Sequence, residues 1–336
     1  MTLENFFSFN EKTTIELNSD INILVGINGS GKSNFIRAIK LLYDSVIGKG
    51  FETIFLKDWS GFDLVANFNN TKADFIKVTY EFDEKAIKKA VNNQGYNFIE
   101  NPIYEIIIHR SGATSYYLEE KIYCESKYKG KAPFSFLEMK NAKGSISTRE
   151  AGEIGLQYYP QENNEITFKT QELVLRQISD PDRYYPIYTL KRAIEGMVVY
   201  DYFDTTLKSK IRQPGVFGTE DKLLPNGENL AQILNRLKNG SLLCIDEPEI
   251  GLHPDMINTT AKAIKDATHT GTQIIIATHS PLLLNSFELD EILIFEKNEN
   301  NNSIVTRKTE EDFEGWGEDF LSGQMWLRGE LGGKRW

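Results

Sequence analysis

The sequence predicts an α/β fold with a mostly parallel sheet, an antiparallel β subdomain and an inserted, mainly helical lobe. Short, wholly apolar segments alternate with helical segments at both ends of the chain, which is typical of a parallel sheet covered on both faces. Segments in the middle alternate apolar and polar residues, as half-buried antiparallel strands do. A following stretch has apolar residues at helical spacing.

The two ends of the chain share one order of elements. Residues 15–25 contain an apolar segment that predicts a strand ending at Val25, and apolar residues from Phe35 onward recur at helical spacing. Near the other end, residues 242–245 and 273–277 predict two buried strands, followed by helices that begin near Pro254 and after Pro281. We expect these strands to share one sheet.

The middle of the chain differs from both ends. Residues 75–82 (FIKVTYEF) and 104–109 (YEIIIH) alternate like antiparallel strands, and residues 171–210 show a helical pattern that includes Met197 and Val198. We therefore expect three parts: residues 1–43 form the N-terminal part of a core, 44–221 an inserted β and helical lobe, and 222–336 the C-terminal part of the core.

Composition narrows the class of protein. Hydrophobic residues make up 40% and charged residues 26% of the 336 residues, which is typical of a globular protein and excludes a disordered one. The net charge of −10 argues against a broad basic surface for DNA, because phosphate contacts need Lys and Arg. A local basic face for nucleic acid is still compatible with this charge. The alternative is that the same basic residues belong to an ordinary solvated loop or helix. The candidates for such a face are Lys121, Lys127, Lys129, Lys131, Lys208, Lys210 and Arg212.

The sequence also bears on location. It has no apolar run long enough to cross a bilayer, and its first residues lack the basic leader and apolar core of a signal peptide. Two cysteines, Cys124 and Cys244, cannot form a disulfide framework. We expect a cytoplasmic protein without membrane contact.

Residues 26–33 (GINGSGKS) match the pattern G-x-x-x-x-G-K-[ST] at every fixed position, between a predicted strand and a predicted helix. In this pattern the glycines turn backbone N–H groups toward phosphates, and the helix N-terminus adds its positive dipole. Lys32 is expected to reach the β- and γ-phosphates of ATP, and the Ser33 hydroxyl to ligate Mg²⁺. The residues expected to contact the nucleotide are Asn28, Gly29, Ser30, Gly31, Lys32, Ser33 and Asn34.

Two further motifs follow buried strands. Asp246 and Glu247 come at the end of the apolar run at 242–245, where Asp246 is expected to hold Mg²⁺ and Glu247 to deprotonate the attacking water. His279 follows the strand at 273–277 by two residues, a position from which it could contact the γ-phosphate. A structural His is the alternative. The catalytic candidates are therefore Lys32, Glu247 and His279.

The segments GINGSGKSN, LLCIDEPEIGLHP and IIIATHS together resemble the ABC-type P-loop ATPases of the RecF, SMC and OLD-nuclease branch. That branch includes the stand-alone AAA family ATPases often found in phage-defence loci. Residues 179–203 and 325–333 resemble the same group. The resemblance implies an ABC-type head that binds ATP and Mg²⁺, with Asp246 as the Walker B aspartate, Glu247 as the general base and His279 as the switch histidine.

The resemblance also implies a homodimer formed around ATP. The loop at 249–253 would reach across this dimer, and the partner subunit would donate a Ser-containing, Gly-rich signature sequence. The candidate signature here is Asn226, Gly227 and Glu228, which lacks the serine, so the signature is either degenerate or missing from this chain. The glutamine that senses Mg²⁺ in such ATPases has three candidates, Gln157, Gln161 and Gln177.

We therefore expect a Mg²⁺-dependent ATPase that dimerises on ATP and switches a partner or nucleic-acid complex, in anti-phage defence or DNA maintenance. The partner would be an effector protein such as a nuclease, or DNA or RNA. One alternative is an ATP-binding scaffold with little turnover that holds an effector nuclease. Another is an OLD-like ATPase and nuclease component, although the 57 residues after His279 are too few for a nuclease domain. The run EPEIGLHP disfavours a transporter subunit.

Overall fold

The computed structural model describes residues 1–66, 73–112, 115–128, 132–160, 167–200, 240–250, 253–269, 271–313 and 321–332. The chain divides into two compact units. The first contains Met1–Glu16 and Lys40–Met197, and the second contains Leu17–Ile39 and Val198–Trp336. The division falls after residues 16, 39 and 197, whereas the sequence suggested boundaries after residues 43 and 221, which stay a prediction.

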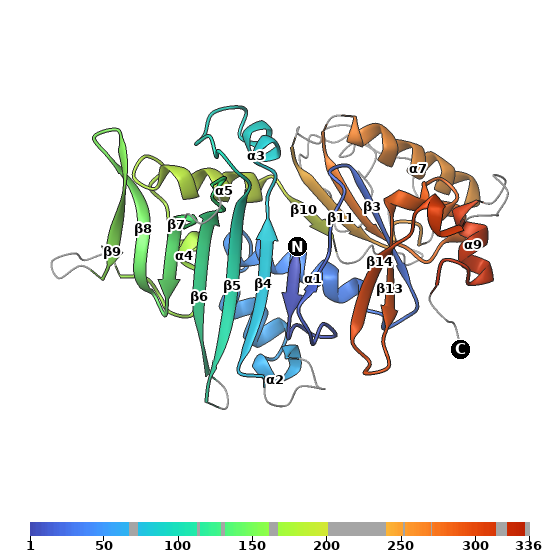
Figure 1. Ribbon diagram of the computed structural model, residues 1–336, viewed down its shortest axis with the longest axis horizontal. Coiled ribbons are helices and arrows are strands. Elements are labelled where there is room, and N and C mark those ends of the chain that lie inside the picture. The colour runs from blue at the N-terminus through green and yellow to red at the C-terminus, as the bar shows by residue number, and fades with distance from the viewer. Residues whose placement is uncertain are drawn as a thin grey trace. The chain divides into compact units, whose positions relative to one another are not determined.

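The first unit contains an antiparallel sheet, which confirms the predicted β subdomain. Its strand order is β2-β1-β4-β5-β6-β7-β8-β9, so that β4 to β9 follow one another as a meander (Figure 1). Strand β4 has alternate buried residues, as the pattern in residues 75–82 predicted. The strands are β1 (Thr2–Glu4), β2 (Thr13–Thr14), β4 (Phe75–Glu81), β5 (Pro102–Ser111), β6 (Ser115–Cys124), β7 (Phe134–Lys140), β8 (Lys143–Glu150) and β9 (Glu153–Tyr159).

Short helices accompany this sheet. They are the π-helix η1 (Thr53–Asp58), α2 (Phe62–Val65), α3 (Glu84–Ala90), α4 (Val174–Gln177) and α5 (Tyr185–Glu195). Helices α4 and α5 account for the first part of the helical pattern predicted over residues 171–210. The prediction is wrong for Val198, which begins a strand instead, because it gains sheet hydrogen bonds to a neighbouring parallel strand. Residues 201–210 lie outside the described residues.

A buried carboxyl group joins strand β6 to helix α4. The Glu120 side chain accepts hydrogen bonds from the backbone N–H groups of Val174 and Leu175 and, at 2.9 Å, from the Tyr104 hydroxyl. Burial raises the pKa of Glu120 to about 7, and these hydrogen bonds only partly oppose the shift. Glu120 therefore changes its protonation near neutral pH while it holds the start of α4.

The second unit contains the predicted, mostly parallel sheet, in the order β10-β11-β12-β3-β13-β14. Only β14 pairs antiparallel to its neighbour. The strand predictions near Val25, at 242–245 and at 273–277 are confirmed. The strands are β3 (Ile21–Gly26), β10 (Val198–Tyr200), β11 (Leu242–Asp246), β12 (Gln273–Ala277), β13 (Ile292–Lys297) and β14 (Ser303–Arg307).

Helices follow these strands as the sequence predicted. Helix α7 lies along the sheet (Figure 1), with Ile257, Ala261 and Ile264 packed into the same core as the strands. The helices are α1 (Lys32–Val46), α7 (Pro254–Thr268), α8 (Pro281–Leu284) and α9 (Ser322–Arg328), with the 3-10 helices η3 (Leu289–Glu291) and η4 (Glu310–Phe313). None of the helices in the described ranges is long and apolar enough to span a membrane.

Two lysines of the candidate basic face lie in the described part of the first unit. Lys121 forms an ion pair with Glu119 at 3.1 Å, and Lys127 forms one with Glu100 at 2.7 Å. Both charges are thus compensated by carboxylates. The other candidates, Lys129, Lys131, Lys208, Lys210 and Arg212, lie outside the described residues.

The raised pKa of Glu120 predicts how stability depends on pH. The native state binds an extra proton between the ordinary value of 4.5 and about 7, so this carboxyl makes the protein less stable as the pH rises through that window. Glu120→Gln keeps an acceptor for the two N–H groups and cannot titrate. Urea unfolding at pH 5 and at pH 7 measures the free energy of unfolding of both proteins. Between these two pH values we expect it to fall on the order of 1–3 kcal/mol further in wild type than in the variant. Parallel pH profiles for the two proteins would contradict it.

Candidate functional site

The Gly-rich loop joins β3 to α1, as the sequence predicted. Gly26, the last residue of β3, lies against β13, and a Cβ atom here would come within 2.3 Å of the Phe295 carbonyl oxygen. Gly29 and Gly31 have φ angles of 80° and 117°, which side-chain-bearing residues rarely adopt. The loop therefore needs glycine at these positions for close approach and for backbone conformation.

The β13–β14 hairpin contacts the Gly-rich loop and the start of α1. The Ser303 hydroxyl donates to the Ser30 carbonyl at 2.6 Å, and the rings of Phe35 and Phe295 lie 5.8 Å apart. The Ser30 side chain is fully buried near Gly26. Ser30 is not among the residues that line the pocket described next, and its contact with a nucleotide stays a prediction.

One pocket of about 150 Å³ brings the three sequence motifs together. The loop contributes its residues at the N-terminus of α1, strand β11 contributes the acidic pair, and the segment after β12 contributes the histidine. This arrangement follows from the sheet, because β11, β12 and β3 are parallel neighbours whose carboxyl ends meet at one edge. The pocket is lined by Asn28, Gly29, Gly31, Lys32, Ser33, Asn34, Asp246, Glu247 and His279.

The Lys32 ammonium group lies within the curve of the loop. Its Nζ atom donates to the carbonyl oxygen of Gly26 at 2.7 Å and to that of Ile27 at 3.4 Å. Burial lowers the pKa of Lys32 to about 8, although the charges of Asp246 and Glu247 act in the opposite direction. Because burial destabilises the charged ammonium group, a hydrogen bond to an anionic oxygen would stabilise it more than its present bond to a carbonyl oxygen does.

Ser33 and Asp246 fit a shared Mg²⁺ ion. The Ser33 Oγ atom lies 3.5 Å from Oδ2 of Asp246, which is the last residue of β11. Two oxygen ligands at about 2.0–2.1 Å from one Mg²⁺ ion lie roughly 3–4 Å apart. The oxygen donors and their spacing therefore suit this ion, which prefers one or two protein oxygens beside phosphate oxygens and water.

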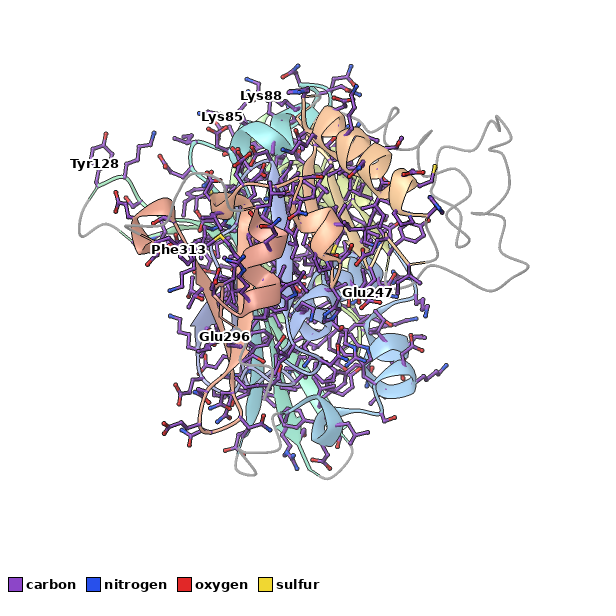
Figure 2. All side chains as sticks on the ribbon, turned by 90° about the vertical axis from the view of Figure 1, so that its right-hand side faces the viewer. Lys85, Lys88, Tyr128, Glu247, Glu296 and Phe313 are labelled. Atoms are coloured by element: carbon purple, nitrogen blue, oxygen red, sulfur yellow. The ribbon has the colours of Figure 1, made fainter. Side chains whose placement is uncertain are left out.

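Glu247, labelled in Figure 2, follows β11 directly. Its N–H group donates to the Ala277 carbonyl at 2.8 Å, which extends the ladder between β11 and β12 by one residue. Its φ angle is 50°, in the left-handed region that costs a residue with a Cβ atom about 1–2 kcal/mol. A strained conformation at a pocket residue is a common feature of functional sites.

His279 faces this carboxylate from the neighbouring strand end. Its Nε2 atom lies 3.7 Å from Oε1 of Glu247, and both side chains are about one third exposed. Burial, followed by the positive charge of Lys32, lowers the pKa of His279, and Glu247 only partly opposes this. The imidazole is therefore neutral at neutral pH and can donate or accept a hydrogen bond.

The remaining predicted site residues fall into two groups. Asn226, Gly227, Glu228 and Gln161 lie outside the described residues, as do residues 251–252 of the loop expected to reach across a dimer. In the first unit, Gln157 accepts a hydrogen bond from Arg183 at 2.6 Å, and Gln177 bonds to the backbone of residues 169–173. The Mg²⁺-sensing glutamine stays unassigned.

Two supporting contacts were missed from the sequence, that of Ser303 and that of Glu249, the first residue of the loop expected to reach across a dimer. Ser303 supports the loop from 273 positions away, and no local pattern signals that contact. Glu249 accepts hydrogen bonds from the Thr278 hydroxyl and from the backbone N–H of His279. An acidic residue close after a buried strand was visible in the sequence, but its inward direction depends on the turn at Glu247.

Family comparison gives two matches. A family model described as "AAA domain" matches residues 1–213, which is more than half of the chain. The chain belongs to this AAA-domain family. A second model, described as "AAA domain, putative AbiEii toxin, Type IV TA system", matches residues 230–285. Together with the motifs, these matches confirm an ABC-type P-loop ATPase of the RecF, SMC and OLD-like branch.

The matches to individual proteins either cover a short segment or have low sequence identity. The Old nuclease of Escherichia phage P2 is 35% identical over 72 residues, which is 21% of this chain and 12% of that protein's length. An SMC head domain from Thermotoga maritima aligns over 92% of this chain and 97% of its own, with a TM-score of 0.42 and 17% identity. A Pyrococcus furiosus Smc head with an extended coiled coil, bound to the C-terminal domain of ScpA, aligns over 93% and 96%, with a TM-score of 0.48 and 11% identity.

The position of Lys32 predicts a loss of nucleotide affinity in Lys32→Ala. Removing a charge-assisted contact costs about 1.5–3 kcal/mol, or roughly one to two decades in the dissociation constant. Lys262→Ala, on the exposed face of α7, is a matched control that should bind as wild type does. Titration calorimetry with ATP and Mg²⁺ measures both. Equal affinity in wild type and Lys32→Ala would rule out the phosphate role of this loop.

Proposed function

We propose that this AAA-domain protein binds ATP with Mg²⁺ at the pocket described above and hydrolyses it. The observation that carries the proposal is the convergence of Lys32, Ser33, Asp246, Glu247 and His279 at the N-terminus of α1. A cation, two oxygen ligands for Mg²⁺ and a carboxylate base are groups that enzymes use for phosphoryl transfer to water.

Each group has a role in this reaction. Lys32 and the N-terminus of α1 bind the phosphates. Ser33 and Asp246 would hold a Mg²⁺ ion, which would neutralise charge on the phosphates. Glu247 accepts a proton from the attacking water, because its carboxylate is exposed to the pocket. His279, whose Nε2 atom lies 3.7 Å from that carboxylate, would donate a hydrogen bond to the γ-phosphate.

The proposal extends to an ATP-dependent homodimer that switches a partner. The side chains of Glu247 and His279 are each about one third exposed, so a second copy could cover them, and ATP differs from ADP by the γ-phosphate that such a copy would contact. The partner is an effector protein such as a nuclease, or DNA or RNA, in anti-phage defence or DNA maintenance. The toxin–antitoxin description of one family match and the phage P2 Old nuclease segment support the defence setting.

A nuclease component is the second candidate, favoured by the likeness to Old nuclease. That likeness covers 72 residues and only 12% of the phage protein's length. Among the described residues, no cluster of three or more His, Cys, Asp or Glu side chains could hold a metal ion. An ATP-binding scaffold with little turnover is a third possibility, which turnover measurements separate from the first.

Glu247→Gln should separate binding from hydrolysis. The amide keeps the shape of the side chain but cannot accept the proton of water, so turnover should fall about 10²–10⁴-fold with ATP affinity nearly unchanged. Phosphate release and calorimetry measure the two quantities. Turnover at the wild-type rate would contradict the general-base role of Glu247.

The same variant tests the dimer. With ATP it should form a dimer in size-exclusion chromatography with light scattering, and with ADP it should stay a monomer. Gly227→Trp, added to Glu247→Gln, should abolish that dimer if Asn226, Gly227 and Glu228 contact nucleotide in the partner. An unchanged dimer would exclude this segment from the nucleotide interface.

The purified protein by itself should cleave no nucleic acid. Its one proposed Mg²⁺ site is occupied by the ATP reaction, and the net charge of −10 predicts weak binding to duplex DNA at physiological salt. Assays with single- and double-stranded DNA and RNA check this. Metal-dependent cleavage that survives in both Lys32→Ala and Glu247→Gln would show a second active site and favour the nuclease candidate.

A further inference from the structure

A carboxylate behind the pocket connects the two loops that carry Glu247 and His279. Glu249 follows Glu247 by two residues and lies in a turn closed by the Ile250 N–H, which donates to the Glu247 carbonyl at 3.2 Å. This turn directs the Glu249 side chain inward. Its Oε1 atom accepts hydrogen bonds from the Thr278 hydroxyl and, at 3.1 Å, from the His279 N–H.

Thr278 connects three segments of the chain. Its side chain is fully buried, and its N–H donates to the Leu24 carbonyl at 3.1 Å, just before the Gly-rich loop. Its hydroxyl accepts from the Ser280 N–H at 3.0 Å while it donates to Glu249. The segment after β12 is therefore tied to β3 on one side and to the turn after β11 on the other.

We propose that Glu249 is a positioning residue, which sets the place of the His279 imidazole relative to Glu247 by holding Thr278 and the His279 backbone. This inference rests on the proposed ATP hydrolysis for its effect on rate. Its structural part, the position of His279, does not depend on turnover.

The energetic reason lies in the surroundings of Glu249. Burial raises its pKa, and the hydrogen bonds from Thr278 and His279 oppose that shift. Its second oxygen, Oε2, is buried and has no hydrogen-bond partner among the described residues. A carboxyl in these surroundings is costly to bury, and the two hydrogen bonds that it accepts offset part of that cost. Small displacements of a reacting group cost large factors in rate.

The test compares Glu249→Ala with Glu249→Gln. The amide oxygen of Gln keeps an acceptor for both donors, so its kcat should stay within about threefold of wild type, whereas Ala should lower kcat at least tenfold. Nucleotide affinity should change less than about threefold in both, because Lys32 and the Gly-rich loop keep their contacts. Glu299→Ala, at an exposed loop position of the same unit, is the control for surface charge and should leave kcat unchanged.

A double-mutant cycle separates positioning from general stability. If Glu249 acts through His279, adding Glu249→Ala to His279→Ala should lower kcat less than about twofold further. A full tenfold loss in that background would overturn the proposal, as would a loss in Glu249→Gln equal to that in Glu249→Ala. Thermal unfolding of each variant confirms that the fold is intact, and Thr278→Val provides a second way to remove one of the two donors.

Histidine NMR supplies a measurement that needs no turnover. The imidazole signal of His279, identified by its disappearance in His279→Ala, should shift in Glu249→Ala and stay near its wild-type position in Glu249→Gln. The His269 signal, from the far end of α7, should not move in either. An unmoved His279 signal in Glu249→Ala would refute the positioning role. If wild type lacked ATPase activity, the proposed function would fail, and this measurement alone would decide where Glu249 acts.

Discussion

The register of three parallel strands is the constraint on which the pocket depends. Asp246 lies opposite Ala277, and Ala277 lies opposite Leu24, so β11 and β12 end at the same level and β3 continues from there for two more residues, to Gly26. Neighbouring strands are only about 4.7–4.9 Å apart. The segments that follow these strands carry the acidic pair, the histidine and the Gly-rich loop, and they therefore line one pocket.

The backbone continues this register beyond the strands. Glu247 donates to the Ala277 carbonyl, and Thr278 donates to the Leu24 carbonyl, so each loop begins as an extension of the ladder. The left-handed conformation of Glu247 then turns its chain away. The side chains of Asp246 and Glu247 would point to opposite faces of a longer strand, but after this turn both line the same pocket. The backbone of Glu247 is fixed by its N–H bond to Ala277 and by the bond that its carbonyl accepts from Ile250.

The electrostatics of the pocket follow from the same closeness. Lys32 has a lowered pKa because it is buried, even though two carboxylates act to raise that pKa. The same lysine helps to lower the pKa of His279, so the imidazole stays neutral. A site with one buried cation, a neutral imidazole and carboxylates at its rim is suited to an anionic ligand that arrives together with a divalent cation.

The sequence by itself determined the parallel strands and the helix after the Gly-rich loop, because apolar runs and glycine spacing are local signals. It also predicted that Asp246 and Glu247 lie near the Gly-rich loop, since they directly follow a strand of the same parallel sheet. Tertiary structure alone decided that Ser30 lies buried, that Val198 belongs to a strand, and that Ser303 and Glu249 support the pocket. These outcomes depend on contacts between distant segments. A hydrogen bond across 273 residues, such as that from Ser303 to Ser30, leaves no periodic trace in the chain, since it needs only one polar atom at the right place after folding.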